Sequence, residues 1–402
     1  MQRKLDLRTG KPVWTAYRVP SVPVDKLKRD VTCDAVVVGM GISGAMIAEA
    51  LTGAGLSVVM IDRRRGALLG STAATTALVQ FEIDRTLSSL IPAIGKNEAQ
   101  QAWRRSRLAV ANLAGRIDRL KIACNTTSRL SLLLAGDMVD ADGLEAEAQA
   151  RRAAGIEATF LDRKALKQRF DFARDGAIVS AGNLQLDPRK LAAGMLNAAR
   201  ERGARFFAPA EAMSIDTTVD GVLVPTADGP TISASYAVLA TGYELMDIVP
   251  KVDHSVISTY ALATPRQAAK PWPEGALVWE ASEPYLYARI THDHRIVCGG
   301  EDENFTDEAR RDALLEEKTA AIVAKMRKLV PGADIRPDFA WAGSFGTTPT
   351  GLPYIGAIPR KPRVFAAMGY GGNGITFSQM ASELVLNAIE GREDPDAHLF
   401  AL

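Results

Sequence analysis

The chain has 402 residues, 47% of them hydrophobic, and its 48 Lys and Arg residues nearly balance its 47 Asp and Glu residues, for a formal net charge of +1. This length and apolar content allow two domains of ordinary size rather than one. A chain with so little net charge has no overall field that attracts polyanions, so we expect no nucleic-acid partner.

The cysteines, histidines and apolar runs bear on compartment and metal binding. The three cysteines lie far apart and form no CxxC pair, which is typical of a reducing compartment. The four histidines form no metal-ligand pattern, and we expect no metal. No stretch reaches the roughly 18 apolar residues that a membrane span requires, and the N-terminus has no apolar targeting run. We therefore expect a cytoplasmic protein without a transmembrane segment.

The first part of the chain predicts an arm followed by a βαβ unit. Residues 1–32 are rich in proline and charge, and we expect them to form an arm laid over the body rather than part of the core. Residues 34–39 then predict a buried strand, residues 43–53 a helix of small side chains, and residues 56–62 a second buried strand. Together they have the size of a βαβ unit, about 30 residues.

Three glycines, Gly39, Gly41 and Gly44, stand between the first strand and the helix in the sequence GMGISG. The first allows a tight turn, the second lets the backbone approach a pyrophosphate, and the third allows close packing of the helix. Asp62 ends the second strand about 20 residues on, where a carboxylate can bind ribose hydroxyls. The pattern predicts a dinucleotide site, and the alternative is a glycine-rich packing turn with an incidental surface aspartate. It does not separate FAD from NAD.

The middle of the chain predicts an insertion and a return to alternating helix and strand. Residues 97–169 are largely helical and amphipathic, which indicates an inserted region. Asp187 and Pro188 form an N-cap and a first helical position for a helix that ends near Gly203.

The remaining segments predict strands, one long helix and a glycine-rich end. Strand-like runs at 204–207 and 237–240 come first, and residues 256–300 form further strands and turns. A long amphipathic helix is expected at about 306–329. From about Trp341 the chain returns to glycine-rich turns and a C-terminal helix.

Four segments, in this order along the chain, carry a resemblance to a known family. They are GSTAATTALVQ at 70–80, LQLDPRKL with the following AARERGARFFAPAEAMSI, YAVLATG at 236–242, and WAGSFGTTPTGLPYIG with FAAMGYGGNGITFSQMASELV near the C-terminus. From about residue 33 onward, the chain resembles the FAD-dependent amine and amino-acid oxidoreductases that include D-amino-acid oxidase, glycine oxidase and sarcosine oxidase.

The resemblance implies FAD as the cofactor. Gly343 stands about where some relatives carry a tethering Cys, and no His lies near residues 70–80, so we expect noncovalent FAD. The residues expected to hold it are Gly39, Gly41, Ile42, Ser43, Gly44, Asp62, Arg63, Ser71, Thr72, Ala212, Thr241, Gly242, Gly372, Asn373, Gly374, Ile375 and Thr376.

The resemblance also implies an α/β fold. A Rossmann-like FAD-binding domain would be interleaved with an α+β substrate domain built on a mostly antiparallel sheet. We assign residues 33–90, 171–250 and 341–402 to the FAD-binding domain, and residues 91–170 and 251–340 to the substrate domain.

The substrate side departs from the family pattern. Relatives that oxidise amino acids often carry an Arg before GxPxIG that binds the substrate carboxylate bidentately, and Phe345 stands at that place here. Arg289 shares a strand face with Tyr285 and Tyr287, so it could bind an acid instead, or point outward beside aromatic packing. The candidates for the substrate pocket and the flavin edge are Tyr287, Arg289 and Asn373.

The expected reaction is oxidation of a C–N bond in a small amine or amino acid, by hydride transfer to FAD and hydrolysis of the imine. Oxygen or another electron acceptor would then reoxidise the FAD. Two alternatives stay open. One is dehydrogenation of a hydroxy acid or polyol phosphate, which a cluster of phosphate-binding Arg residues would favour. The other is a flavin-binding partner or assembly protein without turnover.

Overall fold

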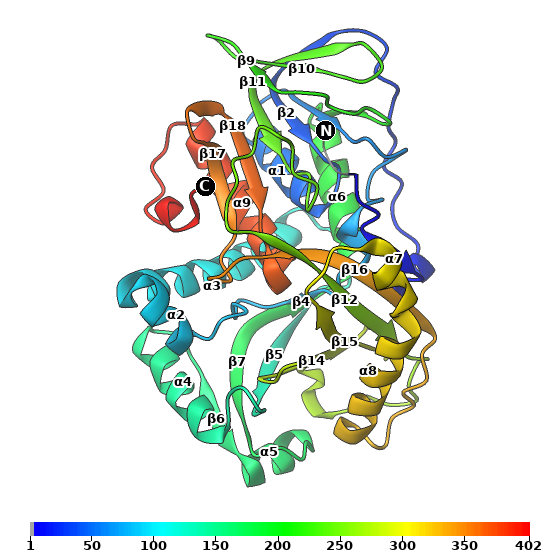
Figure 1. The fold of residues 1–402 in the computed structure, drawn as a ribbon, viewed down its shortest axis with the longest axis vertical. Coiled ribbons are helices and arrows are strands. Elements are labelled where there is room, and N and C mark those ends of the chain that lie inside the picture. Colours follow the sequence, from blue (N-terminus) through cyan, green and yellow to red (C-terminus); the bar gives the residue numbers. More distant parts are fainter. Residues whose placement is uncertain (1–3) are drawn as a thin grey trace.

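Two mixed sheets, one of eight strands and one of ten, organise residues 4–402, the part of the chain that this computed structural model describes. The eight-stranded sheet lies in the upper half of the molecule in Figure 1, and most of the ten-stranded sheet lies below it. The predicted α/β fold with two interleaved sheets is confirmed.

The eight-stranded sheet contains the predicted βαβ unit. Its strands are, in order, β17 (Tyr354–Ile358), β18 (Lys361–Met368), β11 (Thr231–Leu239), β2 (Val31–Val38), β3 (Val58–Ile61) and β8 (Arg205–Phe207), with β10 (Val222–Pro225) between β11 and β9 (Asp216–Thr217). From β18 to β8 the strands run parallel. Val36 and Val37 of β2 are completely buried, as expected for a parallel strand covered on both faces.

Three helices accompany this sheet: α1 (Ile42–Gly53), α6 (Pro188–Glu201) and α9 (Gly374–Ile389). The central one, α1, contacts both of the others and packs against β2 and β3. The start of α6 is the one that the sequence predicts. The Asp187 side chain accepts hydrogen bonds from Arg189 N at 3.0 Å and Lys190 N at 3.1 Å, and Pro188 stands in the first turn.

The ten-stranded sheet is antiparallel except between β13 and β5. Its strands are, in order, β1 (Arg8–Gly10), β16 (Phe339–Thr347), β12 (Ser255–Ala263), β15 (Ile296–Glu303), β14 (Leu286–Ile290), β13 (Leu277–Glu280), β5 (Thr127–Leu134), β7 (Gly176–Gln185) and β4 (Leu78–Val79), with β6 (Thr159–Asp162) beside β7. The remaining helices are α2 (Leu87–Ile94), α3 (Lys96–Arg119), α4 (Ala141–Ala153), α5 (Arg163–Phe170), α7 (Glu308–Ala313) and α8 (Leu315–Leu329).

The strand pairing differs from the predicted division of the chain. The region expected to be largely helical supplies β5, which lies between β13 and β7. Both β7 and β16 belong to the ten-stranded sheet, although we assigned residues 171–250 and 341–402 to the other domain. The expected helix at 306–329 is divided at Leu314 into α7 and α8. Local pattern identifies strands but does not say which sheet they join, because strand pairing is a non-local property.

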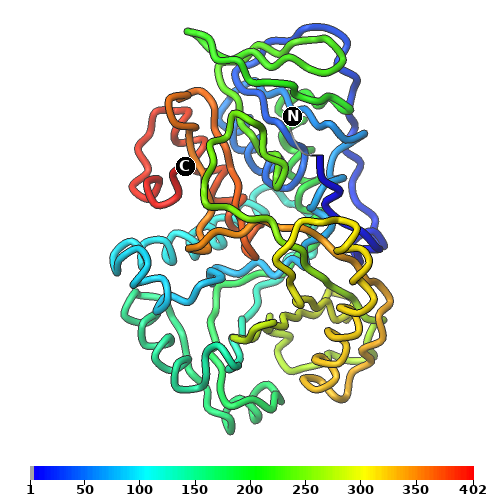
Figure 2. Tube along the Cα trace, viewed as in Figure 1, coloured from blue at the N-terminus to red at the C-terminus, as the bar shows by residue number. Residues whose placement is uncertain are grey.

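The N-terminal arm contributes to the core, contrary to expectation. Within it β1 pairs with β16, and Val13 and Trp14 are buried. The Trp14 indole Nε1 donates to the Thr75 carbonyl at 2.6 Å. Figure 2 shows the dark-blue N-terminal trace passing the junction of the two halves before it rises to the upper sheet. The arm is rich in proline and charge, so its composition did not indicate that Val13 and Trp14 are buried.

No helix within the described residues 4–402 is both long and apolar enough to cross a membrane.

Candidate active site

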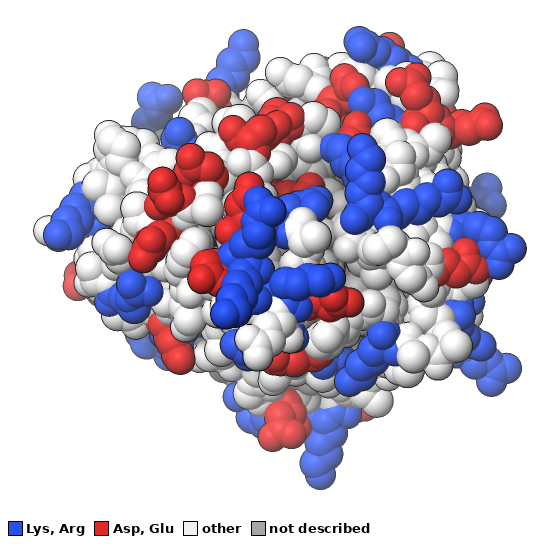
Figure 3. Space-filling model, turned by 90° about the horizontal axis from the view of Figure 1, so that it is seen from below, with Lys and Arg blue, Asp and Glu red and all other residues white. Residues whose placement is uncertain are grey.

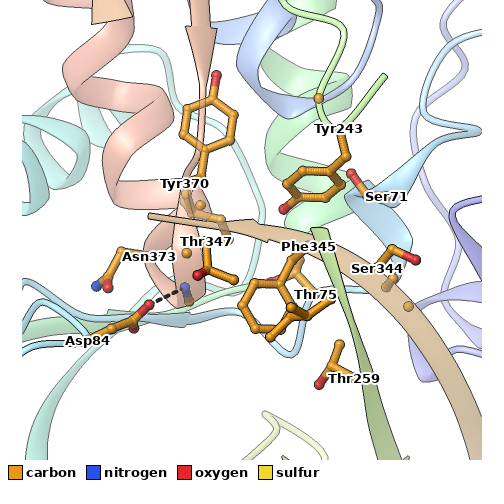
Figure 4. A pocket seen from close by; sticks show the side chains of 18 of the residues that line it. Ser71, Thr75, Asp84, Tyr243, Thr259, Ser344, Phe345, Thr347, Tyr370 and Asn373 are labelled. Atoms are coloured by element: carbon orange, nitrogen blue, oxygen red, sulfur yellow. Dashed lines mark hydrogen bonds between the residues drawn. The ribbon is translucent and has the colours of Figure 1, made fainter. Parts of the chain in front are cut away.

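A cavity of about 990 Å³ runs between the two sheets and is lined by both. The glycine turn before α1 forms one end of its wall, and residues of β12, β14 and β16 face the other end. Small-molecule sites usually measure about 300–1,000 Å³, so this cavity has room for a large ligand together with a smaller one. Figure 4 shows the part of the cavity next to the start of α9.

The glycine turn has the geometry that its sequence predicts. Gly39 has φ +113°, which favours glycine, and it lines the cavity together with Gly41. A Cβ on Gly44 would lie 2.0 Å from the Gly39 carbonyl oxygen, so this glycine lets α1 approach the turn closely. Gly41 caps α1 without a side-chain hydrogen bond, which leaves the positive end of the helix facing the cavity.

The small Ser/Thr-rich segment meets α1 at the cavity. Ser71 and Thr72 belong to a short 3-10 helix (Ser71–Ala73), and the Thr72 hydroxyl oxygen accepts a hydrogen bond from Ile42 N at 3.1 Å. The hydroxyls of Ser43 in α1 and Ser378 in α9 lie 2.8 Å apart. Segments that are distant in the sequence therefore converge where the resemblance places the cofactor.

Asp62 follows β3 and lines the same end of the cavity. Its carboxylate accepts hydrogen bonds from Met40 N at 2.9 Å and Arg64 N at 2.8 Å, and burial raises its pKa. Arg63 lines the cavity as well, but its guanidinium forms an ion pair with Glu244. Three further predicted residues line this end: Ala212, Thr241 and Gly242.

The start of α9 is tied to the loop that follows β4. The Asn373 side-chain nitrogen donates to the carbonyls of Gln80 at 3.1 Å and Glu82 at 2.8 Å, and Gly372 N donates to the Asp84 carboxylate at 2.8 Å. Asn373 lines the cavity, as do Gly374 and Ile375 at the first turn of α9. Thr376 and Gly44 are the two predicted cofactor residues that do not line it. Thr376 instead donates to the Gln80 carbonyl.

Aromatic side chains wall the middle of the cavity. Figure 4 shows Tyr243, Tyr370 and Phe345 around one space, with Thr75 and Thr347 beside them. Burial raises the pKa of both tyrosines, so at neutral pH they carry their hydroxyl protons. The Tyr370 hydroxyl donates to the Ala367 carbonyl at 2.9 Å.

Two tyrosines, one just before β14 and one within it, and an aspartate on β15 form the far wall. The rings of Tyr285 and Tyr287 lie 5.7 Å apart, and both line the cavity. Gly299 makes room for this pair, because a Cβ there would lie 2.4 Å from the Tyr287 hydroxyl. The Tyr285 hydroxyl donates to the Asp302 carboxylate at 2.5 Å, and burial raises the pKa of Asp302 to about 6.

Arg289 does not belong to the residues that line the cavity. It is 2% exposed, and its guanidinium donates to the carbonyls of Ala77 at 3.0 Å and Leu186 at 2.9 Å while stacking on the Trp14 ring. Burial lowers the pKa of Arg289 to about 9. Although it shares a strand face with Tyr287, it does not line the cavity, so the structure brings Tyr287 and Asn373 to the cavity but not Arg289.

Several lining residues were not predicted as site residues: Tyr243, Asp84, Thr259, Asp302 and Tyr370. Tyr243 directly follows the ATG strand end and Tyr370 stands within the glycine-rich turn, so adjacency to these motifs could have indicated both. Asp84 and Asp302 belong to no motif. The pairing of distant strands in the ten-stranded sheet brings them to one cavity.

The residues present fit FAD. The turn keeps its shape only with glycine, because a Cβ at Gly39 would meet the Ala240 carbonyl and one at Gly44 the Gly39 carbonyl. Two helix starts face the cavity, and the Asp62 carboxylate lines it where the resemblance places the ribose. The fold and this site define a dinucleotide-binding protein of two interleaved sheets.

A family model described as FAD dependent oxidoreductase matches residues 34–388, and the chain belongs to this family. It is 25% identical to gamma-glutamylputrescine oxidoreductase of Escherichia coli, over 92% of this chain and 86% of that protein. It is 24% identical to glycine oxidase of Bacillus licheniformis, over 89% of this chain and 93% of that protein.

Solved structures show the same fold. Glycine oxidase from Geobacillus kaustophilus matches with a TM-score of 0.77 and 23% identity, over 92% of this chain and 98% of that one. L-Proline dehydrogenase from P. horikoshii matches with a TM-score of 0.77 and 18% identity, over 93% of this chain and 97% of that one. The predicted family membership is thus confirmed.

Proposed function

We propose that this protein oxidises the C–N bond of a small amine with FAD as the electron acceptor. One observation carries the proposal: a single cavity joins the glycine turn at Gly39 and Gly41 to an aromatic pocket that Phe345 lines. The family resemblance places Phe345 where relatives that oxidise amino acids often carry a carboxylate-binding Arg. A neutral wall at that place suits an amine better than an α-amino acid, because a buried carboxylate needs a cationic partner.

FAD would be held without a covalent bond. The amides at the start of α1 would bind its pyrophosphate and Asp62 its ribose, while the start of α9 at Gly374 and Ile375 would stabilise negative charge on the reduced flavin. When bound, FAD accepts the hydride that leaves the substrate carbon.

The side chains of this protein orient the amine and control its protons. Tyr243 and Tyr370 keep their hydroxyl protons at neutral pH, so neither acts as a base. The Tyr370 hydroxyl already donates to the Ala367 carbonyl, so the Tyr243 hydroxyl is the one that can donate to the substrate. The substrate reacts as the neutral amine and loses two electrons and two hydrogens to become an imine. Water then replaces the nitrogen, which releases a carbonyl compound and ammonia or an amine.

The cavity disfavours the hydroxy-acid and polyol-phosphate alternative. The basic residues on its wall already bind other groups: Arg63 and Arg64 pair with Glu244, and Arg85 donates to the Pro349 carbonyl at 2.9 Å. An anionic substrate would therefore meet no uncommitted guanidinium among the lining residues that the structure describes.

The visible spectrum of the purified protein tests the proposal. We expect bound flavin whose absorbance bleaches when an amine with a hydrogen on its α-carbon is added without oxygen. A matched amine without that hydrogen, such as a tert-alkylamine, should leave the spectrum unbleached. A protein that takes up no FAD would contradict the proposal. Flavin that bleaches only with hydroxy acids, or with nothing in the panel, would favour one of the two alternatives.

A further inference from the structure

The cavity wall carries far more negative than positive charge. Nine acidic and three basic residues line it, and the three basic side chains are the arginines that already bind Glu244 or a backbone carbonyl. The lower face of the molecule differs, because Figure 3 shows Lys and Arg side chains lying beside Asp and Glu side chains there. The whole chain has a formal net charge of +1, so the excess of acidic groups is a feature of the cavity.

Three of these acidic residues, Asp84, Glu283 and Asp302, have no basic partner. Within residues 4–402, none of the three forms an ion pair, whereas the neighbouring Glu280 pairs with Arg174 at 2.6 Å. All three line the same cavity, and the charges of Asp84 and Glu283 both raise the pKa of Asp302. We call this set the carboxylate wall.

A second observation is an unpartnered hydrogen-bond acceptor on the cavity wall. Asn373 is 5% exposed and lines the cavity, and its side-chain oxygen has no hydrogen-bond partner among the described residues. Its side-chain nitrogen binds two carbonyls, so the amide orientation is settled and the free atom is an acceptor. A ligand that donates hydrogen bonds and carries positive charge would satisfy the acceptor and the carboxylate wall together.

We propose that the substrate is an alkyl diamine or polyamine, with one protonated amine bound at the carboxylate wall, chiefly by Asp302 and Asp84, while a second, neutral amine is oxidised. This inference rests on the proposed function and specifies its substrate. The rings of Tyr285, Tyr287 and Phe345 provide the apolar surface along which the methylene chain lies.

The reaction balances as for a simple amine. The C–H bond next to the neutral amine breaks, its hydrogen and electron pair pass to FAD, and the nitrogen loses one proton as the C=N bond forms. Water replaces that nitrogen and yields an aminoaldehyde and ammonia. The protonated amine takes no part in the bond changes and only positions the chain.

The test compares three substrates of equal chain length with the FAD-loaded protein: a diamine, a monoamine and an ω-amino acid. Anaerobic flavin reduction gives the concentration for half-maximal rate with each one. We expect the diamine to act at concentrations about 10- to 100-fold lower than the monoamine, as for one charged hydrogen bond, and the ω-amino acid to be the poorest. In Asp302→Asn and Asp84→Asn the ratio of the half-maximal concentrations of monoamine and diamine should fall toward one. Asp334→Asn, which alters an exposed carboxylate outside the cavity, should behave like the unmodified protein.

Binding to the flavin-free protein gives a readout that does not depend on turnover. The diamine should raise its unfolding temperature more than the monoamine does, and Asp302→Asn should remove the difference. Equal action of diamine and monoamine in both measurements would overturn the inference and leave the proposed function standing. Failure of every amine to bleach the flavin would overturn the proposed function and the inference with it.

Discussion

Replacing Asp302 with asparagine should stabilise the protein at neutral pH, whereas loss of a structurally important carboxylate would destabilise it. Burial in the cavity wall raises the pKa of Asp302 from 3.8 to about 6. The folded chain therefore binds this proton more tightly than the unfolded chain, and ionised Asp302 opposes folding. At about 1.4 kcal/mol for each unit of pKa shift, ionised Asp302 would lower the free energy of unfolding by about 3 kcal/mol. The side chain is partly exposed, so we expect a smaller effect of about 1–2 kcal/mol.

The sign of the effect follows from where the proton is bound. Below the pKa of Asp302 in the unfolded chain, this carboxyl group is protonated in both the folded and the unfolded chain, so Asp302→Asn does not change the free energy of unfolding. The gain develops as pH rises from about 4 to about 6 and is complete above that range. Urea midpoints measured for both proteins near pH 4.5 and near pH 7.5 check this, with the variant expected to gain about 1–2 kcal/mol at the higher pH and less than half of that at the lower. Equal destabilisation at both pH values would refute the reasoning.

Four further predictions concern the cofactor end and the pocket. Gly44→Ala should reduce FAD retention and lower the unfolding temperature, because its Cβ would meet the Gly39 carbonyl, whereas Gly115→Ala, where a Cβ meets nothing within 4 Å, should do neither. Phe345→Arg should lower KM for amino acids and raise it for diamines, and unchanged selectivity would contradict the role given to this position. The kcat/KM for a diamine should rise as pH passes about 6 and Asp302 ionises, a step that Asp302→Asn should abolish. Arg289→Lys should lower the free energy of unfolding by about 1–3 kcal/mol with KM unchanged, since Arg289 binds two carbonyls outside the cavity, and a selective rise in KM would show that it binds substrate.

The cofactor half of the site could be predicted because its determinants are local. The GMGISG turn, the apolar strands on either side of α1 and the Asp187 cap of α6 each lie within a few residues of the chain. Short segments of this kind specify their own backbone conformation. The structure accordingly brings Gly39, Asp62 and Thr72 to one cavity.

The substrate half could not be predicted to the same depth because it depends on strand pairing and sheet packing. The alternation of side chains along a strand correctly predicted that Tyr285 and Tyr287 lie on one face. It could not show that the cavity ends before Arg289. Asp84 and Asp302 come from distant segments and meet only because the ten-stranded sheet closes over the loop after β4. The burial of Trp14 could not be predicted for a similar reason, since its partners Thr75 and Arg289 are far away in the sequence.

Product analysis tests the central claim most directly. The FAD-loaded protein, mixed without oxygen with a substoichiometric amine, should form one carbonyl product for each flavin reduced, and one nitrogen should be released with it. This one-to-one-to-one ratio is the result that amine oxidation predicts. Flavin that stays oxidised with every amine, or reduction without release of nitrogen, would contradict the account.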